Sequence, residues 1–196
     1  MSFCVGLAIV MQLAFVNAKP YINFLMPDVQ VSKECKNEPS HSNVSRTIKP
    51  NNLFWGQPPD ILVCDSSAVK INRVHRATRY WSHLGYSFGN IQKALPSNFI
   101  CMRGEPLANQ ILIDIPSQNF SFGEHLGTTR TWWRTDTGQI LKAKIEIVSG
   151  WENSERILEH ELGHAIGWKD NNITGHIMNR SWSRGGTNSR GMRNKK

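Results

Sequence analysis

The spacing of apolar residues predicts a helix between residues 68 and 84. Apolar side chains recur there at steps of three or four, at Ala68, Ile71, Val74, Ala77, Trp81 and Leu84. Side chains at these steps share one face of an α-helix, because each turn contains about 3.6 residues. The basic residues of the segment fall elsewhere on its surface, and we expect them to face solvent. Gly85 is expected to end the helix.

Five segments have the composition or the alternation of β-strands. The expected ranges are 60–65, 86–91, 109–115, 128–134 and 139–148. The last of them has the period of a half-buried strand, since charged residues at 142, 144 and 146 alternate with Leu141, Ala143, Ile145 and Ile147. The turn residues between the last two segments, Asp136, Thr137 and Gly138, indicate that these strands are neighbours.

A second helix is expected from about residue 154 to residue 166. Ser154 is the expected N-cap, and Glu155 lies in the first turn, where an acidic side chain complements the helix dipole. The apolar side of this helix is formed by Ile157, Leu158, Leu162, Ala165 and Ile166. The chain therefore passes from a strand to a helix, then through further strands to a last helix, the order of a domain that contains both element types.

The first eighteen residues have the pattern of a signal peptide. Residues 3–16 are apolar apart from Gln12, and Ala18 is a small residue before a plausible cut at Lys19. The apolar run is too short for a comfortable membrane span, and no Lys or Arg precedes it. We expect residues 1–18 to be a signal peptide rather than an uncleaved anchor. The protein is then secreted, to the extracellular space or a periplasm, without stable membrane insertion.

The remaining chain divides into three parts. Residues 19–55 are polar, contain four prolines and show little periodicity, which indicates an N-terminal extension or a short pro-segment. Residues 56–182 contain the predicted helices and strands and form the expected domain. Residues 183–196 are rich in Gly, Ser, Asn and Arg and are expected to be a basic, disordered tail.

Composition and charge change this picture little. The 196 residues are 39% hydrophobic and 19% charged, which suffices to bury a core. The net charge is +8, and all 23 basic residues follow residue 18. The simplest interpretation is a soluble, monomeric protein with a basic surface; the alternative is attraction to an acidic surface or polymer. Nucleic-acid binding is not expected.

Three cysteines follow the expected signal peptide, Cys35, Cys64 and Cys101. An exported chain with three cysteines can form one disulfide and leave one thiol over. Cys64 and Cys101 both lie within the expected domain and are the candidate pair. The sequence does not fix the connectivity.

Residues 160–170, with the sequence HELGHAIGWKD, contain a candidate metal site. His160 and His164 are four apart and share one face of the predicted helix, so that both can bind one metal ion. Gly167 allows a sharp turn that can deliver Asp170 as a third ligand. Two imidazoles, a carboxylate and an open coordination position are typical of a catalytic site with one Zn²⁺ ion.

Glu161 follows the first of these ligands, within reach of a metal-bound water. As a general base it would accept a proton from that water as the water attacks a carbonyl, and would then pass the proton to the leaving amine. His176 is an alternative third ligand, although its distance from His164 fits the turn pattern less well than that of Asp170. The segment therefore predicts a zinc-dependent hydrolase.

These residues resemble the motif of the metzincin clan of zinc metallopeptidases, HExxHxxGxx followed by His or Asp. The Asp in the last place is similar to that of the small bacterial snapalysin-type peptidases. Gly175-His176-Ile177-Met178 resembles the methionine turn of the clan, at a spacing like that of matrixins. The close match covers about twenty residues.

The resemblance implies both roles and a fold. It implies that His160, His164 and Asp170 bind zinc, that Glu161 is the general base and that Met178 lies beneath the metal. The implied fold is α+β and zincin- or metzincin-like. It has a twisted, mostly parallel sheet of about five strands with an antiparallel edge strand, two long helices, the active-site helix and a Met-turn.

The expected function is that of a secreted zinc endopeptidase, whose protein or peptide substrate pairs with an edge strand that the resemblance places at residues 123–131. One alternative is a zinc-containing domain that binds a peptide or wall polymer without cleaving it. Another is a hydrolase of a different zincin branch, with its third ligand further downstream. Cys35 could cap the zinc and hold the enzyme latent, or else serve in a disulfide or remain a spare thiol.

Overall fold

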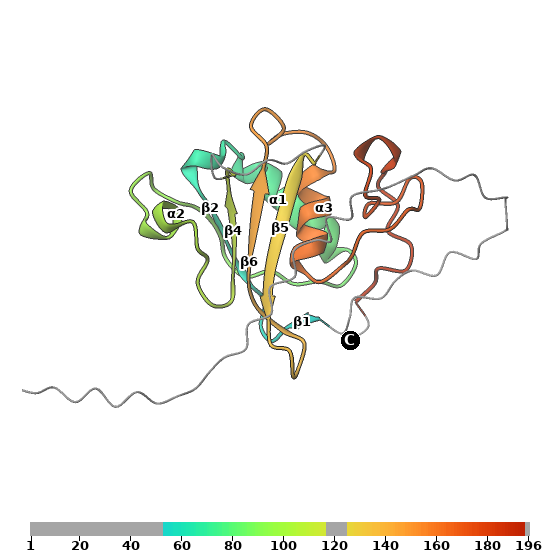
Figure 1. Ribbon diagram of the computed structural model, residues 1–196, viewed down its shortest axis with the longest axis horizontal. Coiled ribbons are helices and arrows are strands. Elements are labelled where there is room, and N and C mark those ends of the chain that lie inside the picture. The colour runs from blue at the N-terminus through green and yellow to red at the C-terminus, as the bar shows by residue number, and fades with distance from the viewer. Residues whose placement is uncertain (1–52, 117–124, 195–196) are drawn as a thin grey trace, which may run out of the picture.

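A mixed β-sheet lies at the centre of the protein (Figure 1). The computed structural model describes residues 53–116 and 125–194, and within these ranges the sheet has six strands. They are β1 (Phe54–Trp55), β2 (Asp60–Val63), β3 (Ile91–Lys93), β4 (Gln110–Asp114), β5 (Gly127–Trp133) and β6 (Gln139–Ile147). The strand expected at 86–91 is displaced, because β3 starts at Ile91, the last residue of the expected range.

The pairing of the strands is parallel except at one edge. The order across the sheet is β3-β2-β4-β6-β5, and the short β1 also pairs with β6, beside Gln139 and Ile140. Only β5 is antiparallel to its neighbour. The predicted α+β architecture with a mostly parallel sheet and an antiparallel edge strand is confirmed at this level.

Three α-helices accompany the sheet: α1 (Ile71–Ser82), α2 (Phe99–Arg103) and α3 (Ile157–Ala165). Helices α1 and α3 pack against each other and, with one face of the sheet, enclose the main hydrophobic core. The apolar side of α1 faces this core as predicted, with Val74, Ala77 and Trp81 fully buried. The core therefore fixes α3, the helix that carries the candidate ligands, against the sheet.

Arg73 of α1 differs from the predicted solvated face, because it is buried. Its guanidinium forms two contacts with the carboxylate of Glu159 in α3, one of them from Nη1 to Oε1 at 2.6 Å. Its Nη2 also donates to the carbonyl oxygen of Ser154. Burial of an arginine requires such pairing, and the pair joins the two helices.

The outer face of β6 is also less exposed than the alternation predicts. Lys144 and Glu146 are buried, and Lys144 Nζ lies 2.9 Å from Glu146 Oε1. Arg130 of β5 pairs with the other oxygen of Glu146 at 2.9 Å, and Asp114 of β4 lies near Lys144. A cluster of opposite charges thus covers the face that we expected to be solvated.

Cys64 and Cys101 are joined by a disulfide, the pair selected from the sequence. Cys64 directly follows β2, and Cys101 lies in α2, a short helix that the apolar pattern did not predict. The Asn98 side chain caps α2 by accepting from the backbone N–H of Ile100 and Cys101. The disulfide ties this peripheral helix to the sheet.

Helix α3 begins later than predicted, at Ile157. The residue before it, Arg156, has a left-handed conformation with φ of 71° and ψ of −23°, and Ser154 provides no cap. The Ser154 carbonyl instead accepts from Arg73. Ser154 therefore lies two residues before Arg156, the actual N-cap, in a segment that contacts α1.

Residues 183–194 differ from the predicted disordered tail. Met192 is buried in the main core, and the backbone N–H of Asn194 donates to the carbonyl of Leu84 at 2.8 Å. Ile177 N–H donates to the carbonyl of Asn188 at 2.8 Å. The segment, which follows α3 in Figure 1, is therefore packed on the domain as far as residue 194.

The beginning of the expected domain also shifts. Trp55 belongs to the sheet through β1, and its indole N–H donates to the carbonyl of Ala165 at the end of α3, so the domain includes residues assigned above to the extension. The expected signal peptide and Cys35 lie outside the described residues. Within the described residues, no helix is long and apolar enough to cross a membrane.

Candidate metal centre

Helix α3 brings the two motif histidines together. His160 and His164 are one turn apart, and their Nε2 atoms lie 3.1 Å from each other. The two rings meet edge to face with their centroids 4.7 Å apart. Both side chains are half-buried, so that one part of each ring remains accessible.

A tight turn after α3 delivers the third residue of the group. Gly167 has φ of 101°, a left-handed conformation that glycine adopts without steric cost, and the N–H of Trp168 bonds to the carbonyl of Gly163. The chain then returns to the helix. Asp170 Oδ1 lies 3.2 Å from Nε2 of His160 and 3.4 Å from Nε2 of His164. The three predicted ligands are thus neighbours in the structure.

Backbone carbonyls select the tautomer of both histidines. Nδ1 of His160 lies 2.8 Å from the carbonyl oxygen of Ile177, and Nδ1 of His164 lies 2.8 Å from that of Trp168. A carbonyl oxygen can only accept, so each Nδ1 carries the hydrogen and donates it. In the neutral rings each Nε2 therefore presents a lone pair toward Asp170.

This arrangement fits a divalent metal ion. Three electron-rich atoms lie 3.1–3.4 Å apart, and Asp170 Oδ1 is buried without a hydrogen bond from any described residue. Ligands bound at about 2.0–2.1 Å in tetrahedral geometry are separated by about 3.3 Å. The donor set and its spacing thus match a site with three protein ligands.

The ionisation states of the groups depend on one another. Burial alone would lower the pKa of His164, but the adjacent Asp170 carboxylate outweighs burial and raises it to about 9. Burial would raise the pKa of Asp170, but its contacts with His160 and His164 hold that pKa well below the ordinary value. Asp170 is therefore ionised at neutral pH, the form in which a carboxylate binds metal.

The side chain of Glu161 contacts strand β5. It is buried, and its Oε2 accepts a hydrogen bond of 2.7 Å from the hydroxyl of Thr129. A β-carbon on Gly127 would lie only 2.8 Å from Glu161 Oε1, so glycine lets this strand approach the carboxylate. Thr129 and Gly127 were missed in the sequence, where nothing marks them as neighbours of a helix thirty residues later.

Met178 packs against α3, the helix that carries both candidate histidine ligands. It is fully buried and packs against Gly163 and Trp81. Its carbonyl oxygen accepts from the N–H of Asn171, the residue after Asp170, at 2.7 Å. The segment with Met178 thereby supports both the helix and the turn that carry the candidate ligands.

His176, the alternative third ligand, lies outside the group. Its Nδ1 accepts from the N–H of Met178 at 3.1 Å and lies 2.9 Å from the side-chain nitrogen of Asn171. It is buried, and burial lowers its pKa. Its contacts are those of a neutral histidine that hydrogen-bonds within the turn.

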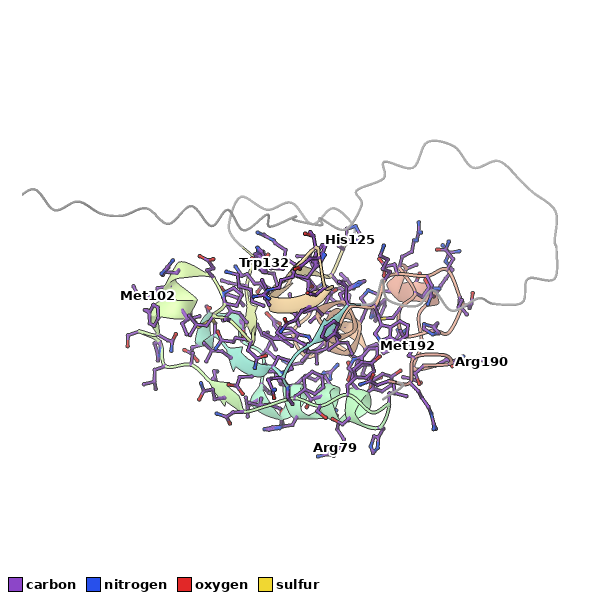
Figure 2. All side chains as sticks on the ribbon, turned by 90° about the horizontal axis from the view of Figure 1, so that it is seen from below. Arg79, Met102, His125, Trp132, Arg190 and Met192 are labelled. Carbon is purple, nitrogen blue, oxygen red and sulfur yellow. A yellow bond between two sulfur atoms is a disulfide. The ribbon has the colours of Figure 1, made fainter. Side chains whose placement is uncertain are left out.

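A small cavity opens beside Glu161 and His160. Its lining also includes Gly127, the first residue of β5, the two residues before it, and residues on both sides of Met178 in the chain. His125, an exposed residue at the start of the described part of this region, belongs to its lining (Figure 2). The cavity therefore adjoins the candidate general base.

Comparison with known proteins gives no relative. No family model, no curated protein and no solved structure matches this chain. The interpretation of the site therefore depends on the residues and distances given above.

Proposed function

We propose that this protein is a secreted zinc-dependent endopeptidase of the metzincin type. The observation that carries the proposal is the convergence of two Nε2 lone pairs and a buried carboxylate oxygen within 3.4 Å of one another. Glu161 stands next to His160 in the chain and shares its cavity. A closed structural site would need neither a fourth, open position nor a carboxylate beside it.

Zn²⁺ suits the donor set formed by His160, His164 and Asp170. Two imidazole nitrogens and one carboxylate oxygen are common zinc ligands in catalytic sites. When bound, zinc supplies Lewis acidity, which polarises a carbonyl group and makes a water molecule more acidic.

Glu161 has the role of the general base. Its carboxylate takes a proton from the attacking water and passes it to the nitrogen of the leaving amine. The Thr129 hydroxyl holds Oε2 by a hydrogen bond, and the close approach of Gly127 restricts the rest of the carboxylate. The buried position keeps this carboxylate in one orientation before the substrate arrives.

Strand β5 is the proposed binding edge for the substrate. It pairs with β6 on one side, and no other strand of the described residues pairs with its opposite side. An extended peptide can add to such an edge by backbone hydrogen bonds. Thr129 on this strand contacts Glu161, which would bring a peptide on β5 close to the general base.

Cleavage of casein or gelatin by the purified protein tests the proposal. We expect cleavage that a chelator abolishes and that added zinc restores, with an inhibitor of serine peptidases as a control without effect. Cleavage that survives the chelator, or a purified protein that takes up no zinc, would contradict the proposal.

A further inference from the structure

Two arginines line the cavity that contains Glu161 and His160. Arg156 immediately precedes α3, and its carbonyl accepts from the N–H of His160 at 2.8 Å. Arg180 follows the Met178 segment, and its N–H donates to the carbonyl of Asn171 at 3.0 Å. The chain segments that position the candidate ligands thus also place two cations at the same cavity.

The side chain of Arg156 is held in place by its neighbours. The guanidinium carbon lies 5.1 Å from the ring centre of Trp182, which itself packs edge to face against Trp151. A β-carbon on Gly185 would lie 3.1 Å from Arg156 Nη1, so glycine leaves room for the guanidinium there. Stacking on an aromatic ring leaves the edge of a guanidinium available for hydrogen bonds in its plane.

Neither arginine forms an ion pair with a carboxylate of the described residues. Other arginines of this chain do, since Arg73 pairs with Glu159 and Arg130 pairs with Glu146. Among the described residues that line the cavity, Glu161 is the one carboxylate, and it accepts its hydrogen bond from Thr129. The lining of the cavity therefore includes two arginines that form no ion pair with a described carboxylate.

We propose that Arg156 and Arg180 bind the carboxylate of an Asp or Glu side chain next to the scissile bond, and so make the enzyme selective for acidic peptides. A guanidinium donates parallel hydrogen bonds that match the two oxygens of a carboxylate. Because the same cavity contains Glu161 and His160, a side chain bound there belongs to a residue adjacent to the cleaved bond. This inference rests on the proposed function and adds the substrate class.

Peptide pairs that differ only in one acidic side chain provide the test. A peptide library with Asp, Glu, Asn, Gln or Lys at each position flanking the cleaved bond is incubated with the purified protein. We expect kcat/KM to be at least about tenfold higher for Asp or Glu than for the matching amide at one position, the usual gain from a charged hydrogen bond. The variants Arg156→Gln and Arg180→Gln should each reduce this ratio.

Arg180→Glu is the sharper variant, because Arg180 is exposed and its replacement preserves the core. It should shift the preference toward Lys at the same position. Arg79→Gln is the matched control, since Arg79 is an exposed arginine of α1 and lies on the opposite side of the molecule from His125 (Figure 2). An acid-to-amide ratio that is near one, or is unchanged in both cavity variants, would overturn the inference.

Binding to the Glu161→Gln variant separates this inference from the proposed function. The fluorescence anisotropy of a labelled acidic peptide and of its amide analogue reports binding without cleavage. Tighter binding of the acidic peptide that depends on Arg156 and Arg180, together with no peptide cleavage by the wild-type protein, would support the anion site and refute the peptidase. Cleavage without acidic preference would support the peptidase and overturn the proposed selectivity for acidic peptides.

Discussion

Gly163 packs directly against Met178. A β-carbon on Gly163 would overlap the sulfur of Met178 and would lie 2.7 Å from a ring carbon of Trp81. Packing therefore explains the glycine of the HELGH segment without reference to metal chemistry. The absence of a β-carbon lets α3 approach the Met178 side chain closely. The two ends of the motif, the helix and the methionine, are in contact.

Gly163→Ala should destabilise the protein. Alanine favours a helix by about 1 kcal/mol over glycine, but overpacking a buried contact costs about 1–3 kcal/mol, and here the overlap involves two fully buried side chains. Urea unfolding measures the net loss. In a Met178→Ala background the cost of Gly163→Ala should be smaller. Equal costs in both backgrounds would show that this contact is not the cause.

Asp170→Ala should weaken zinc binding. Removing groups that merely orient zinc ligands already costs about 10–100-fold in affinity, so loss of a ligand should cost more than a hundredfold or so. Competition with a chromophoric chelator measures this affinity. Asp136→Ala, an exposed residue in the turn before β6, is the control. An undiminished zinc affinity in Asp170→Ala would contradict the assignment of Asp170 as the third ligand.

Thr129→Val should slow catalysis without removing the metal. Valine has a similar shape but cannot donate the hydrogen bond of 2.7 Å to Glu161 Oε2, so the carboxylate loses its orientation. We expect kcat to fall by about tenfold while zinc content and KM change little. Thr78→Val, a buried threonine of α1 whose hydroxyl bonds within its own helix, is the control. A parallel loss of zinc or a pure KM effect would assign Thr129 a different role.

Tyr86 should contribute to the loss of stability at alkaline pH. Its hydroxyl accepts from the indole N–H of Trp168 at 2.9 Å, and burial raises its pKa above the ordinary value of 10.0, the hydrogen bond opposing this. A raised folded-state pKa means that the contribution is complete below pH 10 and is lost as the pH rises through the folded-state pKa.

Tyr86→Phe should therefore flatten the decline of stability above pH 10 and cost about 1 kcal/mol at neutral pH, because the Trp168 N–H loses its acceptor. The free energy of unfolding in urea, measured at a series of pH values, checks both effects. An unchanged slope above pH 10 would show that Tyr86 ionises equally easily in the folded and unfolded chains.

The sequence patterns correctly predicted features that depend on residues close together in the chain. The steps from Val74 to Trp81 give the buried face of α1, and the spacing of His160 and His164 places both on one face of α3. Both relations arise within one helix, where sequence distance translates directly into geometry. The turn at Gly167 also depends on neighbouring residues, and it brings Asp170 to the histidines as expected.

Contacts between distant segments could not be predicted in this way. Met192 is a single apolar residue in a polar segment, without a period that would indicate its burial. Arg73 looks like a surface residue until Glu159 is brought opposite to it. Thr129 and Arg156 carry no motif, and their places beside Glu161 follow only from the pairing of β5 and the left-handed start of α3. Each of these depends on tertiary packing.

The most direct test of the peptidase mechanism is the activity of Glu161→Gln at known zinc occupancy. Glutamine preserves the size of the side chain and its contact with Thr129 but cannot accept the proton. Zinc content and peptide cleavage are measured on the same samples of wild type and variant. We predict equal zinc content and a loss of cleavage rate of at least about a hundredfold. Equal zinc content with an undiminished rate would contradict the proposed role of Glu161 and the mechanism built on it.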